Sequence, residues 1–254
     1  MVDTLSIFAF PKHSMINLVV DSGNTRIKVG LFKDRELVQK ESFLDLSELK
    51  NFIIAARADH LLVSSVNHDP GEILSWAASA EKKISLTPSL PLPITIAYKT
   101  PQTLGVDRVA AVCGAQDLFP NRNCLIIDAG TCINYELLDA QSVYHGGAIS
   151  PGISMRFEAM HTFTARLPLV NANENIGLIG NTTETCLQSG VMNGVLEEVK
   201  GIIKQYQNLY AELTVIMCGG DYPFFENRLK PAIFVAPELV LIGLNRILRY
   251  HVEL

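Results

Sequence analysis

The stretch INLVVDSGNTRIKVGLF, residues 16–32, decides the fold that we expect for this chain. An apolar run rich in β-branched residues ends at Val20, a polar turn with one glycine follows, and apolar and polar residues then alternate. This pattern predicts a β-hairpin with an exposed turn. Asp21 places a carboxylate at the mouth of the turn, and Gly23 lets a phosphate group approach its backbone N–H groups.

The stretch CLIIDAGTCINYELL, residues 124–138, repeats this design with Asp128 at the mouth of its turn. One such turn is most simply an ordinary tight turn, because aspartate and glycine turns are common in β proteins. Two of them, each opening its own half of the chain, favour a two-lobed nucleotide-binding fold in which opposed hairpins hold the β- and γ-phosphates. Lys28, on the strand that leaves the first turn, would add a positive charge there.

Strands and helices mix along the rest of the chain, which predicts an α/β protein. We expect helices over residues 45–58, 72–80, 109–118, 185–207 and 237–250, and further strands over residues 61–66 and 213–218. Residues 1–14 precede the first hairpin and share none of its pattern, so we treat them as an extension. We expect an N-terminal lobe over residues 15–120 and a C-terminal lobe over residues 121–254.

The composition excludes several classes of protein. Of 254 residues, 48% are hydrophobic and 19% are charged, which is too apolar for a disordered tail or a coiled coil. The net charge is -5 and no segment concentrates basic residues, so we expect no nucleic-acid partner. We find no export signal and no run of about 18 apolar residues, so we expect a cytoplasmic protein without a membrane span. The cysteines form no C-x-x-C pair and the histidines show no ligand spacing, which argues against disulfides and zinc.

The segment Gly105-Val106-Asp107-Arg108 leads into a predicted helix and carries two charged side chains. In the first interpretation, Asp107 caps that helix and Arg108 is a solvated residue of its first turn. In the second, Asp107 accepts the proton of an attacking hydroxyl while Arg108, a rigid fork of N–H donors, holds a substrate carboxylate. The segment alone leaves both interpretations open.

In combination and in this order, six motifs resemble those of the type III pantothenate kinases, in the superfamily of acetate and sugar kinases, Hsp70 and actin. The motifs are Asp21–Lys28, Gly105–Arg108, Asp128–Thr131, Gly146–Gly152, Gly180–Thr183 and Gly219–Asp221. The resemblance implies two RNase H-like lobes with a nucleotide cleft between them. It also implies ATP-dependent phosphorylation of pantothenate to 4'-phosphopantothenate, the first step of coenzyme A biosynthesis. Cys132 and Cys186 depart from the family, where alanine is more usual.

The resemblance also implies a role for individual residues. Positions that match the family's ATP-phosphate contacts are Asp21, Ser22, Gly23, Asn24, Thr25, Arg26, Ile27, Lys28 and Thr131. Positions that match contacts to pantothenate are Tyr98, Gly105, Val106, Asp107, Arg108 and Thr183, and Asp107 matches the catalytic base. Asp128 matches a ligand of a monovalent cation, K⁺ or NH₄⁺, which would act beside ATP and Mg²⁺. The family forms homodimers with the substrate pocket near the subunit interface.

Reasoning from the residues also favours a cation at Asp128. Its carboxylate follows an apolar strand, where an isolated charge is costly, and the nearest basic residue before it in the sequence is Arg122. Neutral oxygens of Thr131 and the turn carbonyls would complete a site that suits K⁺. The alternative is an ordinary turn carboxylate that accepts hydrogen bonds from backbone N–H groups.

Two other functions stay open from the sequence. The same fold can phosphorylate a different small hydroxy compound, such as a sugar, although Arg108 beside Asp107 favours an acceptor with a carboxylate. A catalytically silent homologue acting as a regulator would show damage to the acidic residues or to Thr131. Asp21, Asp107, Asp128 and Thr131 are all intact.

Overall fold

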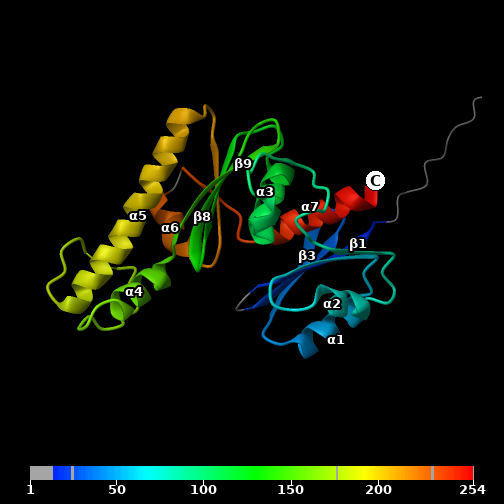
Figure 1. Cartoon of the computed structure of the whole chain (residues 1–254), viewed down its shortest axis with the longest axis horizontal. Helices are drawn as coiled ribbons and strands as arrows, with labels where there is room; N and C mark the ends of the chain where they lie inside the picture. The colour runs from blue at the N-terminus through cyan, green and yellow to red at the C-terminus, as the bar shows by residue number, and fades with distance from the viewer. Residues whose placement is uncertain (1–13, 24–25, 176, 230–231, 254) are drawn as a thin grey trace, which may run out of the picture.

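Two β-sheets of the same plan form the framework of the molecule (Figure 1). The structure is a computed structural model that describes residues 14–23, 26–175, 177–229 and 232–253. The first sheet has the order β3 (Glu36–Phe43), β2 (Ile27–Lys33), β1 (Ile16–Ser22), β4 (His60–Ser65), β5 (Lys82–Ser85). The second has the order β11 (Phe234–Val235), β10 (Thr214–Cys218), β7 (Cys124–Ala129), β8 (Cys132–Leu138), β9 (Val143–Pro151), β6 (Thr95–Ile96).

Each sheet contains one of the two expected hairpins. β1 and β2 pair antiparallel, with Asp21 opposite Lys28, and β7 and β8 pair antiparallel, with Asp128 opposite Asn134. A third antiparallel strand extends each hairpin on one side, and a parallel strand joins it on the other. The expected α/β class and the duplicated hairpin are therefore confirmed.

Helices cover the outer faces of both sheets and fill the space between them (Figure 1). The outer face of the first sheet carries α1 (Leu46–Ala56) and α2 (Pro70–Trp76). The outer face of the second carries α4 (Ile153–Thr162), α5 (Thr183–Leu209) and α6 (Tyr222–Leu229). Between the sheets lie α3 (Val106–Leu118) and α7 (Leu239–Glu253), which pack against each other and share one core with both sheets.

Local sequence explains where the helices begin. The Asp45 carboxylate accepts hydrogen bonds from the backbone N–H groups of Ser47 and Glu48, which starts α1 as predicted. Thr182 and Thr185 form a capping box at the start of α5. The helix expected over residues 72–80 instead begins at Pro70, which suits the first turn because it lacks an N–H group.

The second sheet begins earlier in the chain than the expected lobe boundary at residue 120. β6 pairs with β9 of the second sheet, although it precedes that boundary, and α3 packs on β7 and β8. A short 3-10 helix (Pro101–Thr103) joins β6 to α3. The sheets thus divide the chain between β5 and β6, while the lobe boundary itself stays a prediction.

Strand alternation decides which side chains face the space between the sheets. In β1, Val19 joins the core between the sheets, whereas Leu18 and Val20 join the outer core. Side chains two residues apart share a face, so Asp21 lies on the inner face with Val19. By the same rule Asp128 follows Ile126 onto the inner face of the second sheet. Both hairpins therefore direct their aspartates toward the region between the lobes.

Among the described residues, no helix is long and apolar enough to cross a membrane. All five cysteines are free thiols, and three of them, Cys113, Cys124 and Cys218, are buried.

Candidate active site

A cavity of about 570 Å³ opens between the two hairpins and the start of α3. Seven of the residues that we expected at the site line it, namely Asp21, Gly23, Arg26, Lys28, Asp107, Asp128 and Thr131. The glycine segment after β10 and the first turn of α4 complete its wall. The fold thus brings together residues from six separate segments of the sequence, of which the last contributes Val240 of α7.

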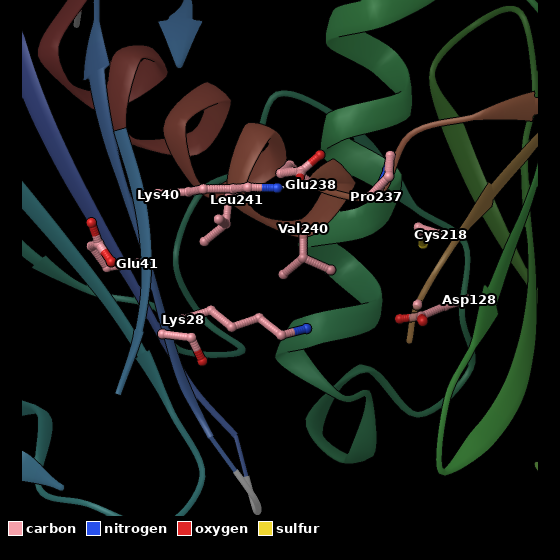
Figure 2. Close-up of a pocket in the computed structure, with 11 residues that line it drawn as sticks. Lys28, Lys40, Glu41, Asp128, Cys218, Pro237, Glu238, Val240 and Leu241 are labelled. Carbon is pink, nitrogen blue, oxygen red and sulfur yellow. Dashed lines mark hydrogen bonds and ion pairs between the residues drawn. The ribbon is translucent and has the colours of Figure 1, made fainter. Parts of the chain in front are cut away.

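A smaller cavity of about 330 Å³ adjoins the first (Figure 2). Figure 2 shows Lys28 extending from the first lobe toward the second, where the Asp128 carboxylate points back toward it. Both cavities include Lys28 and Asp128 in their walls. Lys40 of β3 and Glu238, just before α7, form an ion pair in the wall of the smaller cavity.

Asp21 and Asp128 carry pKa values that are well above the ordinary value of a carboxyl group. Burial raises the pKa of Asp21 to about 6, the nearby Lys28 ammonium opposes this rise, and the charges of Asp107 and Asp128 add to it. Burial likewise raises the pKa of Asp128 to about 6, again against the effect of Lys28. Three carboxylates and one ammonium therefore act on one another across the cleft, and an added cation would be favoured there.

Asp128 has no basic residue close to it in the sequence, but the fold supplies one. Lys28 acts on Asp128 electrostatically, although the two residues lie on different hairpins. The search of neighbouring sequence positions missed this lysine because the fold, and not the chain, brings it close. Gly219 shapes the same corner, since its φ is 90° and a Cβ there would lie 2.5 Å from Asp128 Oδ1.

Asp107 stands in the first turn of α3 with its carboxylate exposed to the larger cavity. The N-cap residue is Gly105, and no side chain caps the helix. The interpretation of Asp107 as a helix cap is therefore wrong. A Cβ on Gly105 would lie 2.5 Å from Asp107 Oδ1, so glycine leaves the space that this carboxylate occupies.

Arg108 is not among the residues that line the larger cavity, and its side chain forms a two-pronged ion pair with Glu136 of β8. Its Nε donates to Glu136 Oε1 at 2.5 Å, and its Nη2 donates to Glu136 Oε2 at 2.8 Å. Hydrogen bonding to Glu136 raises the pKa of Arg108, so the guanidinium stays charged. Arg108 is therefore not a solvated surface residue, since its side chain is only 10% exposed.

Ser22 is buried and does not line the cavity, and a loop after β4 holds it in place. Its hydroxyl lies 2.8 Å from His68 Nδ1, and its carbonyl accepts a hydrogen bond from the N–H of Val66. The Asn67 amide donates to the carbonyl of Gly23. These contacts fix the entrance of the first turn, so a phosphate-binding role for Ser22 would use its backbone.

Other expected site residues lie apart from the larger cavity. Ile27 is buried in the outer core of the first sheet, and Val106 packs at the edge of the core between the sheets. Thr183 lines a different cavity, between α4 and the start of α5, together with Gly180 and Cys186. Asn24 and Thr25 lie outside the described residues. The structure does not bring Thr183 and Asp107 together within one chain.

Sequence reasoning missed two residues near Arg108. Glu136 is 1% exposed, and the hydroxyl of the buried Tyr144 donates to its Oε2 at 2.5 Å. Strand alternation could have revealed Glu136, because it lies two residues before Leu138 and therefore faces the same inner core. A charged residue at an inward position of a strand requires a buried partner.

The sequence match is extensive. A family model described as type III pantothenate kinase matches residues 17–205. A type III pantothenate kinase from Cytophaga hutchinsonii is 42% identical over 237 residues, covering 93% of this chain and 100% of the relative. The chain belongs to the type III pantothenate kinase family.

Solved structures agree with the fold of this pantothenate kinase family member. A conserved Baf family protein from Campylobacter jejuni, described as a transcriptional activator, superposes with a TM-score of 0.62 at 22% identity. That match covers 93% of this chain and 100% of the other. A glucokinase from an Antarctic psychrotroph gives a TM-score of 0.53 at 12% identity over 93% of this chain and 100% of the other. The two-lobed fold expected from the sequence is thereby confirmed.

Proposed function

We propose that this enzyme transfers the γ-phosphoryl group of ATP to the primary hydroxyl of pantothenate, the first step of coenzyme A biosynthesis. The observation that supports this most is the convergence of both hairpins and Asp107 on one cavity, within a chain of the pantothenate kinase family. Phosphoryl transfer has a loose transition state, so most of the acceleration comes from positioning and from charge stabilisation.

We assign separate roles to the residues that line the cavity and to Arg108 and Tyr98, which lie outside its lining. Lys28, Arg26 and Thr131 line the cavity and face the phosphates. Asp107 accepts the proton of the attacking hydroxyl, because its carboxylate is exposed to the cavity and engaged by no helix cap. Arg108 binds the carboxylate of pantothenate and Tyr98 lies beside it, with the guanidinium carbon 5.8 Å from the ring centroid.

The donor set of the cleft fits the metal ions that we propose. Within the described residues, no group of three or more acidic, histidine or cysteine side chains is arranged to hold a metal by itself. Mg²⁺ commonly binds through one or two carboxylates and substrate phosphates, and Asp21 and Asp128 supply such oxygens. When bound with ATP, Mg²⁺ neutralises charge on the phosphates.

We also propose that Asp128 binds a monovalent cation, K⁺ or NH₄⁺. The raised pKa of Asp128 and its oxygen-rich surroundings support this site. The Lys28 ammonium competes with the cation, because it already offsets part of the Asp128 charge. Rates should be compared at constant ionic strength with Na⁺, K⁺ and NH₄⁺, in the wild type and in Asp128→Asn. Equal wild-type rates in all three salts would contradict the cation site.

The proposed cytoplasmic enzyme acts as a homodimer. Thr183, which matches a pantothenate contact, lies in a different cavity from Asp107, so it would have to reach the site of a second copy. Mixing inactive Asp107→Asn subunits with Thr183→Ala subunits should restore activity, because one site of the mixed dimer would then be intact. No gain over the separate variants would contradict this arrangement.

The proposed reaction is tested by an ADP-release assay with pantothenate against a panel of sugars and hydroxy acids. We expect turnover with pantothenate. Turnover confined to a sugar would instead favour the sugar kinase alternative, and no turnover with any acceptor would favour the silent homologue.

A further inference from the structure

Glu136 is a buried charge that contacts Arg108 and belongs to none of the family motifs. It lies on β8, on the inner face of the second sheet, opposite Ile126 in the register and against α3. Only 1% of the surface of Glu136 is exposed to solvent. A carboxylate buried to this degree is costly unless its oxygens are fully engaged.

Three hydrogen bonds compensate Glu136. Arg108 supplies two of them through Nε and Nη2, and the Tyr144 hydroxyl supplies the third. Burial and the Glu136 charge both raise the pKa of Tyr144, so its hydroxyl remains a donor. Glu136 therefore sits between one permanent cation and one neutral phenol.

Aromatic rings hold the face of the same guanidinium. The rings of Tyr98 and Tyr144 stack with an interplanar angle of 4° and centroids 6.4 Å apart, and Arg108 lies over Tyr98. Gly146 makes room for this stack, since its φ is 90° and a Cβ there would lie 2.8 Å from Tyr98 Cδ2. Arg108 is thus fixed along one edge by Glu136 and across one face by Tyr98.

A guanidinium has five N–H donors, and Glu136 takes only the side formed by Nε and Nη2. The Tyr98 hydroxyl also hydrogen bonds with this guanidinium. The N–H groups that Glu136 does not take, on Nη1 and the second of Nη2, are the donors that a second carboxylate would use. Since Asp107 and Arg108 are consecutive in the first turn of α3, these donors have a fixed relation to the catalytic carboxylate.

From this geometry we infer that Glu136 is a positioning residue for the acceptor. It holds Arg108 so that the N–H groups not taken by Glu136 bind the acceptor carboxylate while Asp107 meets the acceptor hydroxyl. The inference rests on the proposed function and names the residue on which the selectivity for a carboxylate-bearing acceptor depends.

The test compares Glu136→Gln with the wild type, using pantothenate and its alcohol analogue, which lacks the carboxylate. Gln keeps the shape of the side chain but removes the charge that orients Arg108. We expect KM for pantothenate to rise about tenfold, with KM for ATP and kcat changed less than about twofold. For the alcohol analogue the two enzymes should differ by less than about twofold.

A double-mutant cycle tests whether Glu136 acts through Arg108. In the Arg108→Ala background, Glu136→Gln should cause no further rise in KM for pantothenate. An additive effect would overturn the inference, as would an unchanged KM for pantothenate or an equal loss with the alcohol analogue. Absence of wild-type turnover with pantothenate would instead overturn the proposed function, and the positioning role with it.

Asp117→Asn provides a matched control at the other end of α3. Asp117 accepts a hydrogen bond from Arg249 Nη2 at 2.5 Å, and this pair is also largely buried. Its loss should lower the melting temperature without changing the ratio of the two KM values. If Glu136→Gln does not fold, Tyr144→Phe removes one bond to Glu136 without a change of charge. It should raise KM for pantothenate about two- to fivefold, and an unchanged KM would overturn the inference.

Discussion

Replacing Asp21 by asparagine should stabilise the protein while it damages catalysis. Asn keeps the shape of the side chain and removes a charge that burial makes costly. Burial raises the pKa of Asp21 from its ordinary value of 3.8 to about 6, and Lys28 offsets only part of this cost. At about 1.4 kcal/mol for each pKa unit, the ionised carboxylate costs at most about 3 kcal/mol of folding free energy. Because Asp21 is only half-buried toward the cleft, solvent screening reduces the expected gain to about 1–2 kcal/mol.

The sign of the effect depends on pH. The folded state keeps the Asp21 proton up to a pH near 6, whereas the unfolded chain releases it near 4. The stabilisation that this carboxyl provides is therefore complete below a pH of about 4 and is lost as the pH rises through about 6. The advantage of Asp21→Asn should be full near pH 8 and should shrink toward pH 5, following the titration of the wild-type carboxyl.

The assay is urea unfolding in buffer free of nucleotide and divalent cations, followed by the fluorescence of Trp76, the single tryptophan. The same variant should lose most of its kcat/KM for ATP. A variant that is less stable than the wild type near pH 8, or a stability difference that does not change with pH, would refute the reasoning.

Three further substitutions test the roles of the α3 N-terminus. Asp107→Asn should lower kcat by roughly 10²–10⁴ with ATP binding nearly unchanged by calorimetry, and an unchanged kcat would exclude a general base there. Arg108→Lys should raise KM for pantothenate far more than KM for ATP, since an ammonium cannot reproduce a two-pronged bond, and equal losses would point to the phosphates or to folding. Gly105→Ala should lower kcat about tenfold, because its Cβ would displace the Asp107 carboxylate, while the unfolding free energy changes by less than about 1 kcal/mol. An alanine variant with normal kcat would show that the carboxylate finds its position without the glycine.

The hairpins and most of the helices were predicted from the sequence, because they depend on patterns within short segments. Both hairpins alternate apolar and polar residues, and their aspartates follow inward-facing strand positions. Once two lobes were expected, this pattern predicted that Asp21 and Asp128 come close to each other. The helices also lie near their predicted ranges, because their capping residues are local signals.

The rest depended on contacts between distant segments. Lys28 reaches Asp128 across the cleft, and Glu136 meets Arg108 between β8 and α3, so neighbouring sequence positions revealed neither partner. Asp107 was open to two interpretations until the backbone showed that Gly105, and no carboxylate, occupies the N-cap position.

The most direct test of the central claim is the mass of the product formed from ATP and pantothenate. The wild type should convert pantothenate to a species heavier by one phosphoryl group, with phosphorus NMR placing that group on the primary hydroxyl and with one ADP released for each product. Asp107→Asn should form the same product far more slowly. ADP release without phosphorylated pantothenate, or phosphate attached at another position, would contradict a single cleft in which both hairpins and Asp107 act on this acceptor.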